Sequence, residues 1–196
     1  MASDVSSETG RDRVLRCAAE LFLARGYAET SLRAIAGEAG MQPASIYHHF
    51  ESKDHLLTEI LDKGMDAIME AFHEAAEKAA GVEDGRLRLQ AHVAGHLHAL
   101  FAHQAFTAAH ITVFPFIPEE VRAAAVPRRD EYEALWTALI KDVATRLPRQ
   151  AITYTRLSLM GAMNSTLHWF DPKNGTVDKL AAATVATLWN GMSSHQ

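Results

Sequence analysis

The sequence predicts an all-α fold, with a small N-terminal three-helix domain followed by a larger helical domain. Apolar residues recur at intervals of three and four along almost the whole chain, which is the helical period, and no alternating strand pattern occurs. The chain has 196 residues, of which 48% are hydrophobic, so it can bury a core in each of two domains. We expect a disordered tail at 1–10, the first domain at 11–58 and the second at 59–196.

The first predicted helix runs from Arg11 to Arg25, has one apolar face and ends at Gly26. A second helix follows Thr30, whose hydroxyl can cap its first free N–H groups. Gly40 then falls where a tight turn between two short helices requires a positive φ. These signals predict a helix-turn-helix.

Pro43 suits the first position of the next short helix, because the N–H that proline lacks would be unpaired there in any case. Ile46 and Phe50 are four residues apart, so we expect them to point inward together with Pro43. The outer face of this helix is then formed by Ala44, Ser45, Tyr47 and His48. Such a short, polar and uncharged face is typical of a helix that reads base edges in a major groove.

This stretch resembles the DNA-binding domain of the TetR family of transcriptional regulators, over roughly residues 11–58. The residues that carry the resemblance are Phe22, Gly26, Tyr27, Thr30, Ile35, Ala36, Ala39, Gly40, Ile46, Tyr47, His49, Phe50, Lys53 and Leu56. The resemblance implies an N-terminal helix-turn-helix DNA-binding domain and a C-terminal helical ligand-binding and dimerisation domain. It also implies a homodimer, a double-stranded DNA operator and a small effector as partners. Family members often carry Ser or Thr in place of Gln42, whose amide could bind adenine through two hydrogen bonds.

The candidate DNA-binding residues are Thr30, Ser31, Arg33, Gln42, Ala44, Ser45, Tyr47, His48, His49 and Lys53. Ser52 can cap a long helix, and Lys53 lies in its first turn, beside free N–H groups that suit a phosphate. We expect Tyr47 and Lys53 to contact phosphates and Gln42 to contact a base.

The charge balance limits this interface. The net charge is −5, and residues 1–60 hold six Arg and Lys against nine Asp and Glu. A basic surface is the usual footprint of a nucleic-acid binder. We therefore expect few phosphate contacts in each subunit and a modest dependence of binding on salt.

The remaining chain reads as helices separated by glycine and proline. We expect helices at 52–80, 86–103, 104–112, 127–147, 150–170 and 176–191, with an aromatic turn at 113–118 and one short helical turn at 118–125. Two prolines in the aromatic turn and Pro127 after it are taken as helix boundaries.

The last two helices are predicted to form a dimer interface. Gly161 and Ser165 are small and four residues apart, so a partner helix can approach closely. The final helix has an apolar face that is wider than one neighbour needs, and it includes Leu180, Thr184 and Leu188. A four-helix bundle from two subunits would hold two recognition helices on a palindromic operator. The alternative is that these residues form an ordinary intrachain core.

Position in the chain, rather than a motif, guides the choice of effector-binding residues. The candidates are His96, Phe101, Phe106, His110, Phe114, Trp136, Met160, Met163, Asn164 and His168. Large apolar side chains with methionine suit an irregular hydrophobic ligand, although each could be plain core. Residues 160–172 are similar to a helix end in family members that sense acyl-CoA thioesters. This similarity makes a fatty acid or an acyl-CoA the leading hypothesis.

The histidines raise a metal-sensing regulator as an alternative. His92 and His96 are four residues apart and could share a zinc ion, with His103 and His110 following at intervals of seven. No cysteine or carboxylate falls on the same stripe, so we predict a polar pocket wall instead, with no metal and no cofactor. A metal-dependent hydrolase is less favoured, because the sequence has no H-E-x-x-H, G-x-S-x-G or P-loop motif. We therefore expect a regulator that is not an enzyme.

The sequence also indicates where the protein works. It has no run of eighteen apolar residues, and its first ten residues do not resemble a signal peptide. Cys17 is the only cysteine, so no internal disulfide can form. We expect a cytoplasmic protein.

Overall fold

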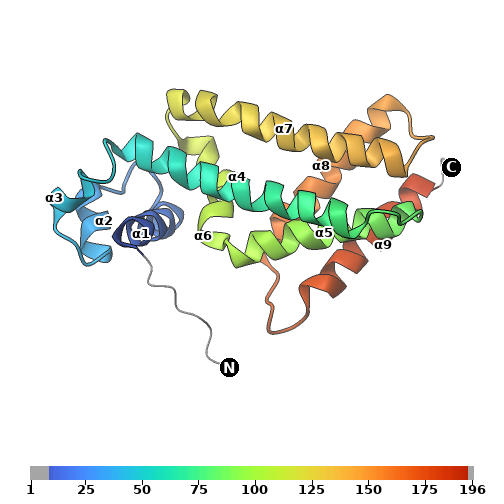
Figure 1. The fold of residues 1–196 in the computed structure, drawn as a ribbon, viewed down its shortest axis with the longest axis horizontal. Coiled ribbons are helices and arrows are strands. Elements are labelled where there is room, and N and C mark those ends of the chain that lie inside the picture. The colour runs from blue at the N-terminus through green and yellow to red at the C-terminus, as the bar shows by residue number, and fades with distance from the viewer. Residues whose placement is uncertain (1–8, 194–196) are drawn as a thin grey trace. The chain divides into compact units, whose positions relative to one another are not determined.

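Only helices and their connections occur in the part of the chain that the structure, a computed structural model, describes, residues 9–193 (Figure 1). This confirms the predicted all-α fold. Most of the predicted tail, residues 1–8, lies outside the described residues. Two compact units are present: among the described residues, unit 1 comprises the chain up to residue 64 together with 105–126, and unit 2 comprises 65–104 together with the chain from residue 127 onward.

Unit 1 contains the predicted helix-turn-helix. Its elements are α1 (Gly10–Arg25), α2 (Leu32–Glu38), α3 (Pro43–Ile46), the first part of α4 (Lys53–Lys78), α6 (Gln104–Thr107), a π-helical turn (Ala109–Val113), a 3-10 turn (Phe114–Phe116) and the start of α7 (Glu119–Val143). The sequence predicted a domain that ends at residue 58. The structure instead adds residues 105–126, whose Ala109, Val113 and Val121 join the core of α1 to α4.

The predicted turns of the helix-turn-helix are present. Gly26 ends α1 with a φ of 86°, and Gly40 has a φ of 65° between α2 and α3. Both values lie in the left-handed region that favours glycine. Ile46 and Phe50 are buried as predicted, whereas Pro43 is exposed. Pro43 occupies the first position of a four-residue helix at the surface and has no core to reach.

The cap of α2 differs from the prediction. Ser31, rather than Thr30, accepts a hydrogen bond at its hydroxyl from the N–H of Ala34, at 3.2 Å. Thr30 is only 2% exposed, and its hydroxyl donates to the carbonyl of Gly26 at 2.8 Å. Ser52 does cap α4, since its hydroxyl accepts from the N–H of His55 at 3.0 Å.

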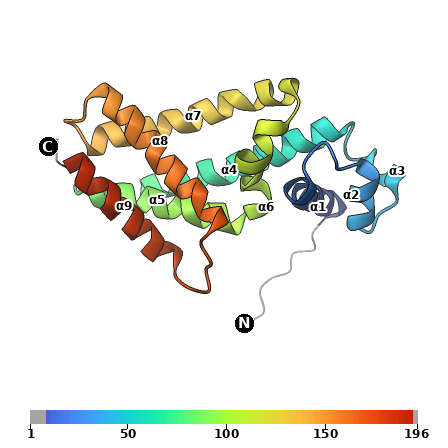
Figure 2. The ribbon, with the colours of Figure 1, turned by 180° about the vertical axis from the view of Figure 1, so that it is seen from behind.

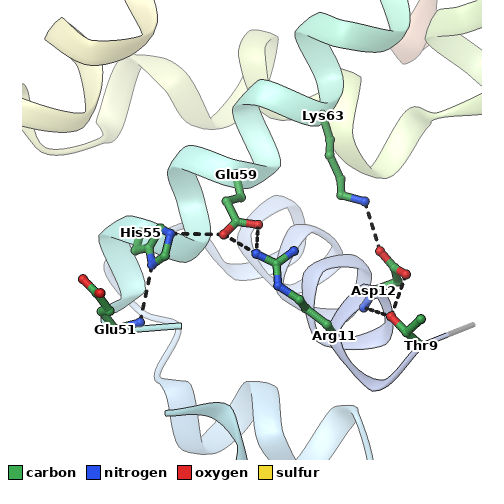
Figure 3. A network of polar contacts seen from close by, with 7 residues as sticks. All are labelled: Thr9, Arg11, Asp12, Glu51, His55, Glu59 and Lys63. Carbon is green, nitrogen blue, oxygen red and sulfur yellow. Dashed lines mark hydrogen bonds and ion pairs between the residues drawn. The ribbon is translucent and has the colours of Figure 1, made fainter. Parts of the chain in front are cut away.

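Ion pairs join the start of α1 to α4 (Figure 3). Arg11 donates to both carboxylate oxygens of Glu59, which also lies 3.1 Å from His55. Lys63 reaches Asp12 at 3.0 Å, beside the N-terminal cap of α1. These pairs are partly exposed, so each stabilises modestly, but together they fix α1 against the first half of α4.

Unit 2 contains the rest of α4 and α7, with α5 (Gly85–Ala102), α8 (Arg149–Ser165), a 3-10 turn (Thr166–His168) and α9 (Val177–Ser193). α9 lies along α5 and also packs against α8 (Figure 2). Ala181 and Val185 on α9 are buried, while Leu180, Thr184 and Leu188 are half-buried.

Three helix boundaries differ from the sequence prediction. α7 continues through Pro127, where a break was predicted. A proline inside a helix removes one N–H and therefore one helical hydrogen bond. Pro127 is exposed, so water can bind the carbonyl that is left without a donor, and the helix continues. Pro127 is also the first residue of the second segment of unit 2. The helix predicted at 104–112 changes to a π-helical turn after Thr107, and the one predicted at 150–170 ends as an α-helix at Ser165.

Candidate nucleic-acid interface and ligand site

The outer face of α3 and the residues beside it are open to solvent. Gln42, Ala44, Tyr47, His48 and His49 are exposed, with Tyr47 at 63%, while Ser45 is half-buried. The face is polar and has no Arg, Lys, Asp or Glu. A short helix with such a face can enter a major groove and bind base edges through amide, hydroxyl and imidazole groups.

A shallow hollow of about 510 Å³ lies next to this face. Its lining includes five of the predicted DNA-binding residues, Thr30, Ser31, Arg33, Tyr47 and Lys53. Arg33 and Ser31 are exposed at the start of α2. Guanidinium, hydroxyl and phenol groups at one edge of a recognition helix can together donate to phosphate oxygens.

Lys53 has a role that the sequence did not reveal. Its ammonium donates to the carbonyls of Tyr27 and Thr30, at 2.9 and 3.0 Å, and lies 4.1 Å from the centre of the Tyr27 ring. Asp54 accepts a hydrogen bond from the Tyr27 hydroxyl, and burial together with this bond raises the pKa of Tyr27. Lys53 therefore ties the turn between α1 and α2 to the start of α4, and two of its three N–H donors are already used.

Lys53→Met is expected to lower the free energy of unfolding by roughly 1–3 kcal/mol, because two backbone carbonyls lose a charged donor. Binding to all DNA sequences should weaken as well, since the turn that holds Ser31 and Arg33 loosens. Urea unfolding and fluorescence anisotropy with labelled DNA would measure the two effects. Lys63→Met is the matched control, because Lys63 makes a partly exposed ion pair that contributes about 1 kcal/mol or less. Weaker DNA binding with unchanged stability would instead show that Lys53 acts only as a phosphate contact.

The predicted effector-binding residues divide between the two units. Phe106, His110 and Phe114 belong to unit 1. There, His110 Nε2 lies 2.7 Å from the carbonyl oxygen of Leu61, and the His110 ring stacks on the Phe114 ring. The others belong to unit 2: His96, Phe101, Trp136, Met160, Met163, Asn164 and His168. Phe101 packs on Phe170, Met160 lies beside Arg156, Met163 is buried, and His168 is exposed.

Within unit 2, His96 and Trp136 meet in a buried cluster that also includes Tyr132. His96 Nδ1 lies 2.7 Å from the Tyr132 hydroxyl, and the ring centres of His96 and Trp136 are 6.2 Å apart. Burial lowers the pKa of His96 to about 4, and the nearby Asn164 amide opposes this shift. The imidazole is therefore neutral at pH 7. Tyr132 is not among the predicted effector-binding residues, and only the folded structure shows its contact with His96.

Two hollows open on the surface of unit 2. One, of about 470 Å³, is lined by residues that include Phe72, His92, Leu135 and Leu139. The other, of about 560 Å³, is lined largely by alanines of α4 and α5, and Gly95 of α5 also lines it. None of the ten predicted effector-binding residues lines either hollow.

The histidine stripe does not extend along one helix. α5 ends at Ala102, so His103 caps it and His110 belongs to a later turn. His92 Nδ1 lies 2.8 Å from the carbonyl of Arg88. Within residues 9–193, no group of three or more His, Cys, Asp or Glu side chains is arranged to hold a metal ion. In the same part of the chain, no helix is long and apolar enough to cross a membrane.

Two regions of the chain match known families. Residues 14–60 match the bacterial regulatory proteins of the tetR family, and residues 82–192 match the tetracyclin repressor-like C-terminal domain. The chain is 30% identical to the HTH-type transcriptional repressor KstR2 of Rhodococcus jostii over 200 residues, which cover 98% of this chain and 96% of that one.

Solved structures share the fold. A TetR-family transcriptional regulator from Bordetella parapertussis superposes with a TM-score of 0.83 at 24% identity, over 92% of this chain and 94% of that one. AibR in complex with isovaleryl coenzyme A and operator DNA superposes with a TM-score of 0.73 at 24% identity, over 91% of this chain and 97% of that one. The helix-turn-helix, the helical second unit and these matches agree, and the chain belongs to the TetR family of bacterial regulatory proteins.

Proposed function

We propose that this regulator is a ligand-responsive repressor, which binds a palindromic operator as a homodimer and is released by a small hydrophobic effector. The observation that carries the proposal is the exposed, polar and uncharged face of α3 beside the hollow that holds Arg33 and Tyr47. The similarity to the repressor KstR2 over almost the full chain supports it.

Gln42 and Tyr47 have different expected roles on DNA. Gln42 is exposed immediately before α3, where its amide can bind one base, whereas Tyr47 lies in the hollow and can bind a phosphate. Gln42→Ala should therefore cost roughly 1–3 kcal/mol on the operator and relax the preference at one base pair. Tyr47→Ala is the contrasting variant, because its effect should be similar on all sequences. Equal loss on operator and random DNA for Gln42→Ala would remove it from base recognition.

A dimer through α8 is supported by an exposed stripe along that helix. Tyr154 and Leu157 are 59% and 52% exposed, and they continue into Gly161 and Ser165 at helical spacing. A Cβ added at Gly161 would meet nothing within 4 Å in its own chain. The stripe therefore combines unpaired apolar area with room for a second helix.

Gly161→Arg tests the dimer without disturbing the fold of the subunit. The side chain would point into open space in the monomer but would collide with a partner helix. We expect monomers in analytical ultracentrifugation, unchanged helix content by circular dichroism and weak operator binding. Gly37→Arg, at another helical glycine with nothing within 4 Å, is the control and should leave the dimer intact. A dimeric Gly161→Arg protein would place the interface elsewhere.

An acyl-CoA thioester is the proposed class of effector. The similarity of residues 160–172 to acyl-CoA sensors supports it, and the complex of AibR with isovaleryl coenzyme A and operator DNA is a precedent within the same fold. Arg122 and Arg128 are cations near the start of α7 that could bind the phosphates of CoA. Arg128 already pairs with Asp66, and Arg122 donates to the carbonyls of Pro115 and Ile117, so a CoA phosphate would have to compete with these partners.

The response would require no catalysis. A ligand that binds the DNA-incompetent arrangement more tightly shifts the population toward it. α4 and α7 each run from one unit into the other, so they are the continuous elements through which a change in unit 2 could reach unit 1.

Sequencing of sheared genomic DNA retained by the purified protein would test the proposal. Recovery of a few palindromic sites, lost when an acyl-CoA is added, is the expected result. Retention of all DNA equally would contradict a sequence-specific repressor.

A further inference from the structure

The buried cluster of His96, Tyr132 and Trp136 holds two donors that the fold itself pairs poorly. His96 Nε2 and Trp136 Nε1 are fully buried and make no hydrogen bond of normal geometry among the described residues, although the Asn164 side chain lies near His96 and the Tyr132 hydroxyl lies near Trp136. We propose that this cluster is the polar subsite of the effector site and binds an uncharged carbonyl oxygen, such as that of a thioester, in preference to a carboxylate. The proposal rests on the proposed function and names the group that the effector must carry.

The hydrogen-bonding inventory defines what the cluster lacks. The buried Tyr132 hydroxyl has no other acceptor among the hydrogen bonds of the described residues, so we assign it as the donor to His96 Nδ1, 2.7 Å away. The proton of the neutral imidazole then lies on Nε2, so Nε2 is a donor. The indole Nε1 of Trp136 can only donate. The nearest acceptors, the Asn164 side chain for His96 and the Tyr132 oxygen for Trp136, miss normal hydrogen-bond geometry, and buried polar groups are normally well paired. A carbonyl oxygen placed between the two donors would give both a better acceptor.

The cluster has no net charge with which to bind an anion. Burial lowers the pKa of His96 to about 4 and raises that of Tyr132, so both are neutral at pH 7. Burial also lowers the pKa of His92, whose ring centre lies 6.4 Å from that of Trp136. A carboxylate would lose its hydration without gaining a counter-charge, whereas a carbonyl needs only donors.

An apolar route to the cluster begins at the hollow of about 470 Å³. Phe72 and His92 line that hollow, and Phe72 packs edge-on against Trp136 with ring centres 5.3 Å apart. Leu135 and Leu139 form part of the same wall. An acyl chain in this hollow would bring its carbonyl to Trp136 once the Phe72 ring turns aside.

Matched ligands test the carbonyl directly in the unaltered protein. S-acyl-CoA thioesters and S-alkyl-CoA thioethers, paired over chains of about four to sixteen carbons, differ by the carbonyl oxygen. Their dissociation constants would be measured by isothermal titration calorimetry. We expect at least one thioester to bind about tenfold or more tightly than its thioether, and 2-alkanones to bind more tightly than fatty acids of matched length. No thioester preference in any pair, or tighter binding of the free acids, would overturn the proposal.

Trp136→Phe then assigns the preference to the indole. It removes Nε1–H and keeps an aromatic ring, so the ratio of thioether to thioester dissociation constants should fall toward one. Trp189→Phe makes the same exchange on α9, outside residues 160–172 and outside both hollows of unit 2, and should leave the ratio unchanged. If Trp136→Phe does not fold, the ligand pairs on the unaltered protein still decide. An unchanged ratio in folded Trp136→Phe would mean that Nε1 serves an internal water only, and would overturn the proposal.

Operator binding separates failure of this inference from failure of the proposed function. Release of operator DNA by thioester and thioether alike would leave the repressor intact and remove the carbonyl subsite. A thioester preference in a protein that binds no operator would retain the subsite and remove the repressor.

Discussion

Gly64→Ala is expected to lower the free energy of unfolding by roughly 1–3 kcal/mol, because the site has no room for one more carbon. A Cβ at Gly64 would lie 2.7 Å from the carbonyl oxygen of Phe106 and 2.9 Å from its carbon. Both atoms belong to the backbone, so no side-chain rotation can relieve the contact. α4 would have to move away from the segment at Phe106, which belongs to the same unit.

Gly37→Ala provides the matched control within unit 1. Gly37 also lies in a helix, and its added Cβ would meet nothing within 4 Å. Alanine there should stabilise by about 0.5–1 kcal/mol, because it restricts the unfolded chain and favours the helix. Urea unfolding of the two variants should thus give opposite signs for the same chemical change. Stabilisation by Gly64→Ala would show that α4 and the Phe106 segment are not closely packed.

Acidification from pH 7 to pH 4 is expected to destabilise the protein through His96 by up to about 3 kcal/mol. The pKa of this group is about 4 in the folded protein, against an ordinary value of 6.5. Between these values the unfolded chain binds a proton that the folded protein does not, so unfolding is favoured as the pH falls. Above pH 6.5 the contribution is fully present. His92, whose pKa is also lowered by burial, acts in the same direction.

The pH dependence of unfolding in His96→Gln isolates this group. Glutamine cannot take up the proton, so the free energy of unfolding should decline less steeply between pH 6.5 and 4 than it does in the unaltered protein. This holds whatever the stability of the variant at pH 7. His48→Gln makes the same exchange at an exposed site and controls for the chemical change. A decline that is as steep in His96→Gln as in the unaltered protein would place the buried proton site elsewhere.

The features that the sequence predicted correctly depend on short-range chemistry. Gly26 and Gly40 occupy positions where the backbone adopts a positive φ, which favours glycine. Ser52 caps α4 by accepting a hydrogen bond from the N–H of His55, three residues away. Thr30 and Ser31, by contrast, are adjacent hydroxyls that could each cap α2. Which one does so depends on the position of the Gly26 carbonyl, and this is fixed only when the turn folds.

Lys53 illustrates the same limit at the candidate DNA interface. Its place in the first turn of α4 suggested a phosphate contact, but the carbonyls of Tyr27 and Thr30 are more than twenty residues away in the sequence. For the effector site, the sequence predicted only that the lining would be largely apolar. Hydrophobicity alone does not distinguish a core side chain from a pocket wall. The proposed effector subsite makes that distinction through buried nitrogens of His96 and Trp136 that lack a hydrogen bond of normal geometry, and this feature exists only once the helices have packed.

The discontinuity of unit 1 has a consequence for how such regulators can diversify. Ala109, Val113 and Val121 share one core with α1 to α4, although some forty residues of unit 2 separate them from α4's first turns in the sequence. A single recombination crossover after the helix-turn-helix would join one ancestor's α1–α4 to another's core segment, and the mismatch would be buried. Given the proposed role of α3, operator specificity would be exchanged between relatives most safely by changes on α3 alone, or by a hybrid gene that carries both segments from the same parent.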